Sequence, residues 1–97
     1  MHAALVRFEL RLPEVRSLKS KRTVIKTLTS TLRSTFGVAV AEVDHQDLWK
    51  RSTLGVALVS GQAGHLDRQV HSVRRFIDRV PEVEVLNVGV SHLEDPG

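Results

Sequence analysis

The order in which strand-like and helix-like apolar patterns follow each other constrains this chain more than any other feature of its sequence. In residues 2–12 alternate positions are apolar, which predicts a half-buried strand. Pro13 ends this strand because proline has no amide to donate to the sheet. Residues 17–36 place apolar side chains at spacings of three, four and seven, which predicts a helix. Ser17 suits its N-cap, and Gly37 suits the left-handed residue that closes it.

Two strand-like stretches then follow in direct succession. Residues 38–45 and 52–60 are rich in β-branched side chains and predict a hairpin joined by the polar segment QDLWKR. A second helical stripe comes next and ends at Pro81; its members are Leu66, Val70, Val73, Ile77 and Val80. Residues 83–92 predict a last strand, with a bulge near Val85 and Leu86.

This element order predicts one fold for the whole chain. With right-handed crossovers, strand, helix, strand, strand, helix, strand gives the ferredoxin-like βαββαβ arrangement. We therefore expect an α+β fold in a single domain over residues 1–97, with a four-stranded antiparallel sheet and two helices on one face.

Composition excludes several classes of function. The chain has no Cys, which removes disulfides, thiolate metal sites and thiol nucleophiles. It shows neither a glycine-rich phosphate loop nor a Ser in a glycine-rich elbow, so we expect no enzyme, no catalytic residue and no cofactor. Arg7 and Glu9 interrupt the first apolar stretch and no later run is long enough to span a bilayer, so we expect a cytoplasmic protein without membrane contact.

Charge is distributed unevenly along the chain. Residues 1–36 hold eight of the 14 Lys and Arg but only two of the 11 Asp and Glu. The remainder of the chain is acidic on balance, which predicts a positive end and a negative end. Such a polarity could steer a polyanion or a second copy of the chain.

The segment RSLKSKR, residues 16–22, concentrates the positive charge at the start of the first predicted helix. Cations there oppose the helix dipole and cost about 0.3 to 1 kcal/mol of stability each. If a phosphate bound at the free amides, the same cations would contribute favourably by attracting it. The alternative is that these side chains simply extend into water. The candidate residues for binding an anion or a nucleic acid are Arg16, Lys19, Lys21, Arg22 and Lys26.

The hairpin segment offers two further candidates. Asp44, His45 and Asp47 have metal-binding chemistry, but acids near turns commonly bond the backbone, so we expect no metal there. Trp49, the one tryptophan, is flanked by Lys50 and Arg51. It could stack on a base or sugar, and the alternative is that it fills a core edge or a subunit contact.

The sheet face opposite the helices is predicted to carry small and partly apolar side chains. It offers no aromatic ring to stack bases, which disfavours RNA recognition on that face. Exposed apolar surface of this kind favours packing against a second subunit; a monomer with scattered exposed side chains is the alternative. The candidate contacts for a homodimer or another protein are Leu5, Ala57 and Val59, together with Trp49.

Three segments carry a resemblance to a known family: SLKSKR (17–22), VAVAEVDHQDLWKRSTLGVALVS (38–60) and RFIDRVPEVEV (75–85). Together they resemble the YlxP-like family of small bacterial proteins, a domain of unknown function. The resemblance implies a ferredoxin-like fold, a cytoplasmic location and no established activity, cofactor or catalytic residue. Members are often encoded beside genes for translation initiation and ribosome maturation, which implies an RNA or ribosome connection by association. Relatives commonly place an acid where this chain has Ser20, so the reciprocal capping bond with Ser17 is weaker here.

These observations favour a non-enzymatic module that binds RNA or another polyanion through the helix start. The alternative is a structural or adaptor protein that acts by homo-oligomerisation and protein contact through the open sheet face.

Overall fold

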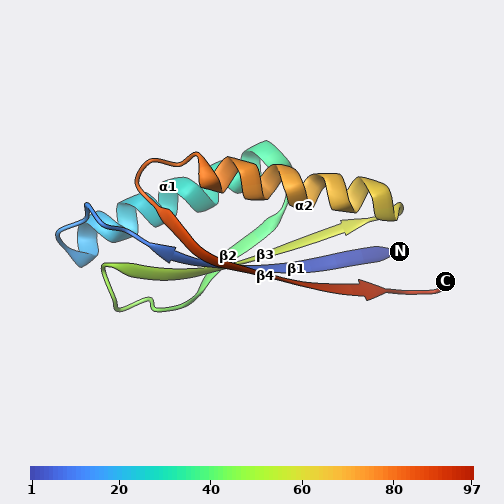
Figure 1. The fold of residues 1–97 in the computed structure, drawn as a ribbon, viewed down its shortest axis with the longest axis horizontal. Coiled ribbons are helices and arrows are strands. Elements are labelled where there is room, and N and C mark those ends of the chain that lie inside the picture. Colours follow the sequence, from blue (N-terminus) through green and yellow to red (C-terminus); the bar gives the residue numbers. More distant parts are fainter.

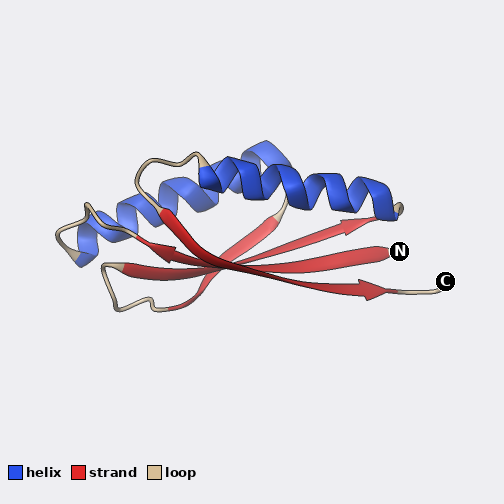
Figure 2. Ribbon diagram, in the orientation of Figure 1, coloured by secondary structure: helices blue, strands red, loops and turns tan.

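The structure, a computed structural model, describes residues 1–97 and contains six regular elements (Figures 1 and 2). In chain order they are β1 (His2–Arg11), α1 (Leu18–Phe36), β2 (Ala39–Asp44), β3 (Arg51–Ser60), α2 (Ala63–Asp78) and β4 (Glu84–Glu94). The strands pair antiparallel in the order β2-β3-β1-β4. Both helices cover one face of this sheet, as Figure 2 shows. The predicted ferredoxin-like α+β fold is confirmed.

Local sequence explains where α1 begins and ends. The Ser17 hydroxyl accepts a hydrogen bond from the Ser20 amide at 3.0 Å, which satisfies one of the free donors of the first turn. Gly37 has a φ of 64°, and its amide donates to the Arg33 carbonyl at 3.0 Å. Because a left-handed backbone favours glycine, this position closes the helix. Both predicted caps are confirmed.

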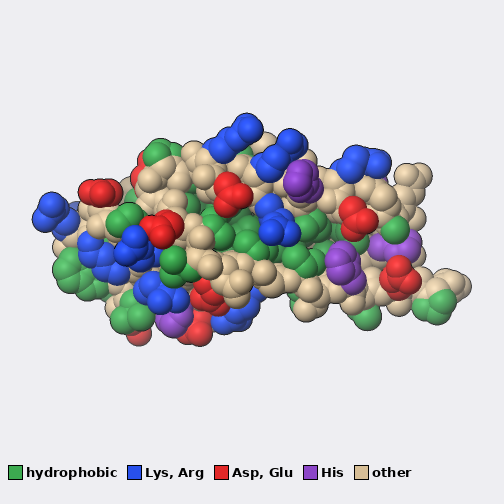
Figure 3. Space-filling view, in the orientation of Figure 1, with side chains coloured by type: hydrophobic (Ala, Val, Ile, Leu, Met, Phe, Trp, Pro, Cys, Tyr) green, Lys and Arg blue, Asp and Glu red, His purple; other side chains and the backbone are tan.

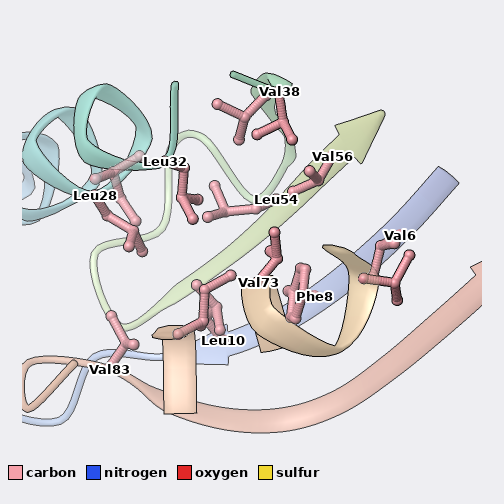
Figure 4. Packing of buried hydrophobic residues seen from close by; sticks show 14 of the residues in the cluster. Val6, Phe8, Leu10, Leu28, Leu32, Val38, Leu54, Val56, Val73 and Val83 are labelled. Atoms are coloured by element: carbon pink, nitrogen blue, oxygen red, sulfur yellow. The ribbon is translucent and has the colours of Figure 1, made fainter. Parts of the chain in front are cut away.

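The core lies between the helices and the covered face of the sheet (Figure 4). Alternate residues of β1 point into it, and Phe8 and Leu10 have no exposed surface. Leu28 and Leu32 from α1 and Val73 from α2 belong to the same core cluster. The half-buried strand and the two helical stripes were therefore predicted correctly.

The register between β1 and β4 shifts by one residue near the start of β4. Glu9 pairs with Asn87 and Leu10 pairs with Val85, which leaves Leu86 as the extra residue of a bulge. The predicted bulge is thus confirmed, and β4 continues to Glu94, two residues beyond the predicted end.

The molecule is elongated, with Cα extents of 48 × 21 × 19 Å. The β2–β3 connection and the start of α1 lie at one end, and both chain termini lie at the other (Figure 1). The termini are joined there, since the Asp95 amide donates to the Met1 carbonyl at 3.0 Å.

Candidate functional site

Lys21, one of the predicted anion-binding residues, is fully buried. Its ammonium lies 2.6 Å from the Glu42 carboxylate and donates to the carbonyls of His45 at 2.7 Å and Gln46 at 3.2 Å. The three donors of a lysine ammonium are therefore matched by three acceptors. This corrects the sequence expectation, because a charge neutralised inside the protein does not serve an anion from solvent.

The position of Lys21 on the helix explains its burial. Leu18, Lys21 and Ile25 are separated by three and four residues, so the lysine continues the apolar stripe that faces the core. A cation on an apolar stripe is a signal visible in the sequence, and it points to a buried partner rather than to a surface site.

The other predicted cations remain on the surface. Arg16, Lys19, Arg22 and Lys26 are exposed, and none of them has a carboxylate within 4.0 Å. At 3.6 residues per turn, Lys19, Arg22 and Lys26 fall within roughly 60° of one another and about 110° from the buried stripe. We call these three residues the α1 cationic stripe.

Arg33 shows which way this stripe faces. It continues the same helical row, and its guanidinium donates to the Val40 carbonyl of β2 at 2.7 Å. The stripe therefore lies on the outer flank of α1, above the β2 edge and away from α2.

Charge separates between the two layers of the molecule rather than between the two halves of the chain. The two helices hold eight of the 14 Lys and Arg and two of the 11 acids. Apart from buried Lys21, the paired Lys and Arg all lie on strands: Arg7 with Glu9 and Asp44, Arg11 with Glu84, and Arg51 with Glu9. Figure 3 shows Lys and Arg side chains along the helix edge of the molecule and a further group at the end opposite the chain termini.

Helix α2 also contributes to this surface, which was not predicted from the sequence. Arg68, Arg74 and Arg75 are exposed and also lack a carboxylate within 4.0 Å. Counting charge by half-chain hid them, because the acids of the second half lie mainly on strands and loops. Counting charge by predicted element would have found them.

Residues 45–50, which we call the hairpin tip, are held in place by hydrogen bonds on two sides. Lys21 binds two of its carbonyls from α1, as described above. On the other side the Lys50 ammonium donates to the Pro13 carbonyl at 2.7 Å, and the Leu12 amide donates to the Lys50 carbonyl at 2.9 Å. His45 takes a left-handed backbone with a φ of 61°, and its amide donates to the Asp44 carboxylate at 2.8 Å.

Two candidates from the sequence lie at or beside the hairpin tip. Asp44 bonds the turn backbone, and no group of three His, Asp or Glu side chains is assembled in the structure that could hold a metal ion. Trp49 is 45% exposed, so it does not fill a core edge. Trp49 also stands apart from Leu5, Ala57 and Val59, which lie on the open face of the sheet.

The open sheet face carries a shallow groove of about 680 Å³. Leu5 and Ala57 pair across β1 and β3 and line it. Small residues form its floor, including Gly55, which lets the Val43 side chain lie close, and Gly89, where an added Cβ would meet nothing within 4 Å. Val59 is exposed at the edge of this face.

Beyond the groove the same face becomes polar. The Glu9 carboxylate accepts from the Thr53 hydroxyl at 2.7 Å and from the Arg7 guanidinium at 2.8 Å. The Thr53 bond, followed by the nearby Arg7, holds the pKa of Glu9 below its ordinary value, although partial burial acts in the opposite direction.

Comparison with known proteins identifies the family. The family model described as "Protein of unknown function (DUF503)" matches residues 3–90. The chain belongs to this family. The uncharacterised protein YlxP of Bacillus subtilis is 37% identical over 68 residues, which cover 70% of this chain and 74% of that protein. The resemblance to YlxP-like proteins is thereby confirmed.

A solved structure supports the fold of this DUF503 member. The de novo designed protein Foldit4 matches with a TM-score of 0.53 at 16% identity, over 96% of this chain and 98% of the designed one. Such a likeness concerns the fold alone. Neither helix has the combination of length and hydropathy needed to cross a membrane.

Proposed function

We propose that this protein binds RNA or a related polyanion through its helix layer, with the α1 cationic stripe and Arg16 as the main contacts. The observation that carries this proposal is the separation of paired from unpaired charge. The exposed arginines of the sheet have carboxylate partners, whereas the exposed cations of the stripe have none. Cations without partners keep their full attraction for phosphate, and their binding releases counterions from the nucleic acid.

The start of α1 adds to this attraction. Its first turn contains no acid, so the positive end of the helix dipole is not compensated. Ser20 stands where a carboxylate would have weakened the field. Lys19 and Arg22 therefore act together with the helix terminus at one end of the molecule.

A salt titration with structured RNA tests the proposal. We expect affinity to fall steeply as salt rises, and we expect a Lys19→Gln/Arg22→Gln/Lys26→Gln variant to reduce the slope of log K against log salt by about 2 to 3, close to one unit per lost phosphate contact. A matched variant removes three sheet cations that have carboxylate partners: Arg7, Arg11 and Arg51. Absence of binding, affinity that ignores salt, or equal losses in the two triple variants would each refute the proposal.

A second candidate function is self-association through the open sheet face. It is favoured by large aliphatic side chains exposed on that face: Leu5 at 64%, Val59 at 64% and Leu93 at 73%. At the usual strand spacing and rise, the apolar part measures about 20 by 20 Å, or roughly 800 Å² over two partners. That is below the area of most stable dimers, so we expect dissociation constants in the micromolar range or weaker.

Gly89 provides the test of self-association. A Gly89→Leu variant places a side chain in the groove without an internal clash, and we expect it to be monomeric at concentrations where the unaltered protein sediments as a dimer. Gly61→Leu is the matched control, because Gly61 is equally unobstructed and lies outside the groove. If the unaltered protein is still monomeric at about 100 times a micromolar concentration, self-association through the open sheet face is excluded.

A further inference from the structure

We propose that the hairpin tip presents Trp49 as a stacking platform for an unpaired nucleobase, so that the nucleic acid bound beside it is single-stranded. This inference rests on the proposed function and names the class of ligand. Single-stranded nucleic acid is typically held by a cationic track for the phosphates and an aromatic side chain for the bases.

Among the Phe, Tyr and Trp side chains, Trp49 is the one available for such stacking. The chain has no Tyr, and its Phe residues are otherwise engaged: Phe8 is buried, while Phe36 and Phe76 pack edge to face at 5.6 Å between the helices. Trp49 is 45% exposed. Because indole buries a large area when covered, an exposed indole is a strong site for a planar partner.

The segment that carries the indole is held in place before any ligand arrives. Lys21 contributes a buried ammonium to hold His45 and Gln46, and Lys50, next to Trp49, is bonded to Pro13 through its side chain. A pre-organised segment loses little conformational entropy on binding. More of the stacking energy of the exposed ring therefore contributes to affinity.

The phosphate track begins at the same end of the molecule as this platform, because the start of α1 and the β2–β3 connection both lie there (Figure 1). Lys21 points from α1 into the hairpin tip. Lys19, two residues before it, and Arg22, the residue after it, belong to the cationic stripe on the outer flank of α1. Asp47, which is exposed at the tip itself, would repel a phosphate there. The arrangement therefore suits a neutral base on Trp49 and phosphates along the stripe.

A protein partner fits the hairpin tip less well. Its exposed apolar side chains are Leu48 and Trp49 alone, and the other residues of the tip are polar or charged. Protein contacts generally need a wider apolar centre than two adjacent side chains provide.

Tryptophan fluorescence gives a direct test, because the single indole reports on Trp49 alone. The unaltered protein is titrated with a 12-nucleotide oligouridine and with a blunt duplex carrying the same number of phosphates, while binding is followed independently by anisotropy of a dye on the probe. We expect saturable quenching with the single strand and none with the duplex. Trp49→Ala should weaken single-strand binding about 5- to 150-fold, the effect of one stacked base, and leave duplex binding within about twofold.

Two further variants guard against misfolding as an explanation. Trp49→Phe keeps an aromatic ring and should retain most of the single-strand affinity, and Leu48→Ala removes the neighbouring apolar side chain and should leave affinity unchanged. The circular dichroism spectra and melting curves of all variants establish that they are folded.

The outcomes separate this inference from the proposed function. Salt-dependent binding with unchanged indole fluorescence, or equal losses of single-strand and duplex affinity in Trp49→Ala, would overturn the stacking site and leave the cationic surface standing. A blue shift of the indole on raising protein concentration without nucleic acid would overturn it in favour of a protein contact. Failure of both probes to bind would remove both proposals.

Discussion

Replacing Lys21 with Met should destabilise the protein strongly, although methionine preserves the apolar stem and the helix. The ammonium is fully buried and has three acceptors, and the Glu42 oxygen that it contacts also accepts from the Ser52 hydroxyl at 2.6 Å. Removing the ammonium leaves two carbonyls without this donor, and it leaves the Glu42 carboxylate with the Ser52 hydroxyl but without its cation. The free energy of unfolding should therefore fall even though methionine fills most of the space of the lysine side chain.

The size of the effect follows from the exposure of the partner. Removing one member of a buried ion pair costs about 3 to 5 kcal/mol. The Glu42 side chain is 18% exposed and can regain some water, so we expect the lower end, about 3 kcal/mol. Against a total stability of roughly 5 to 15 kcal/mol, this lowers the melting temperature by about 12 to 24 °C.

Urea unfolding of Lys21→Met, Glu42→Gln and the double variant would measure this effect. We expect a coupling energy of about 1 to 3 kcal/mol between the two positions, because each residue loses its main partner when the other is changed. Amide exchange in residues 45–50 should also accelerate in Lys21→Met, since the hairpin tip loses one of its two attachments. The reasoning is refuted if Lys21→Met costs less than about 1 kcal/mol, or if the two single effects add to within about 0.5 kcal/mol.

Three further perturbations have defined outcomes. Because the pKa of Glu9 is lowered in the folded state, its contribution to stability is complete above its ordinary pKa of 4.5 and is lost as pH falls through the lowered pKa. Thr53→Val should raise the pKa of Glu9, measured by NMR titration, and should flatten the acid limb of the curve of stability against pH. An unchanged pKa would contradict the Thr53 hydrogen bond as its cause. Ser20→Glu should complete a capping box with Ser17 and raise the unfolding free energy by about 0.5 to 1 kcal/mol while weakening RNA binding. Thermal melting measures the change in stability, and the salt titration measures the change in affinity. A gain in RNA affinity would argue against the helix start as an anion site. Gly37→Ala should cost about 1 kcal/mol in urea unfolding because alanine is strained at a φ of 64°, and an unchanged midpoint would show that the helix end relaxes.

The fold was predictable because each element carries its own periodic signal. The alternation in β1 and the stripe of α2 each identify an element and its buried face without knowledge of any other element. The bulge near Leu86 was also visible, because it interrupts the alternation within a single strand. Such features depend on neighbours in sequence.

The arrangement of the candidate site was less predictable because it depends on contacts between distant residues. Glu42 and the carbonyls of His45 and Gln46 meet Lys21 from more than twenty positions away, and only folding brings them under α1. The apolar stripe gave a warning about Lys21, but it could not name the partner. Similarly, the exposure of Trp49 could not be predicted from local sequence, since it depends on how the hairpin lies beside residues 12 and 13.

The joined termini described above have a practical consequence for any attachment to this molecule. A tag, surface linkage or neighbouring segment at either terminus leaves from the end opposite the start of α1, along an axis that extends 48 Å. Immobilisation through either terminus should therefore present the cations and the indole freely to a passing strand. The same proximity means that a short linker between the termini would permit circular permutation, with new ends opened in a loop elsewhere.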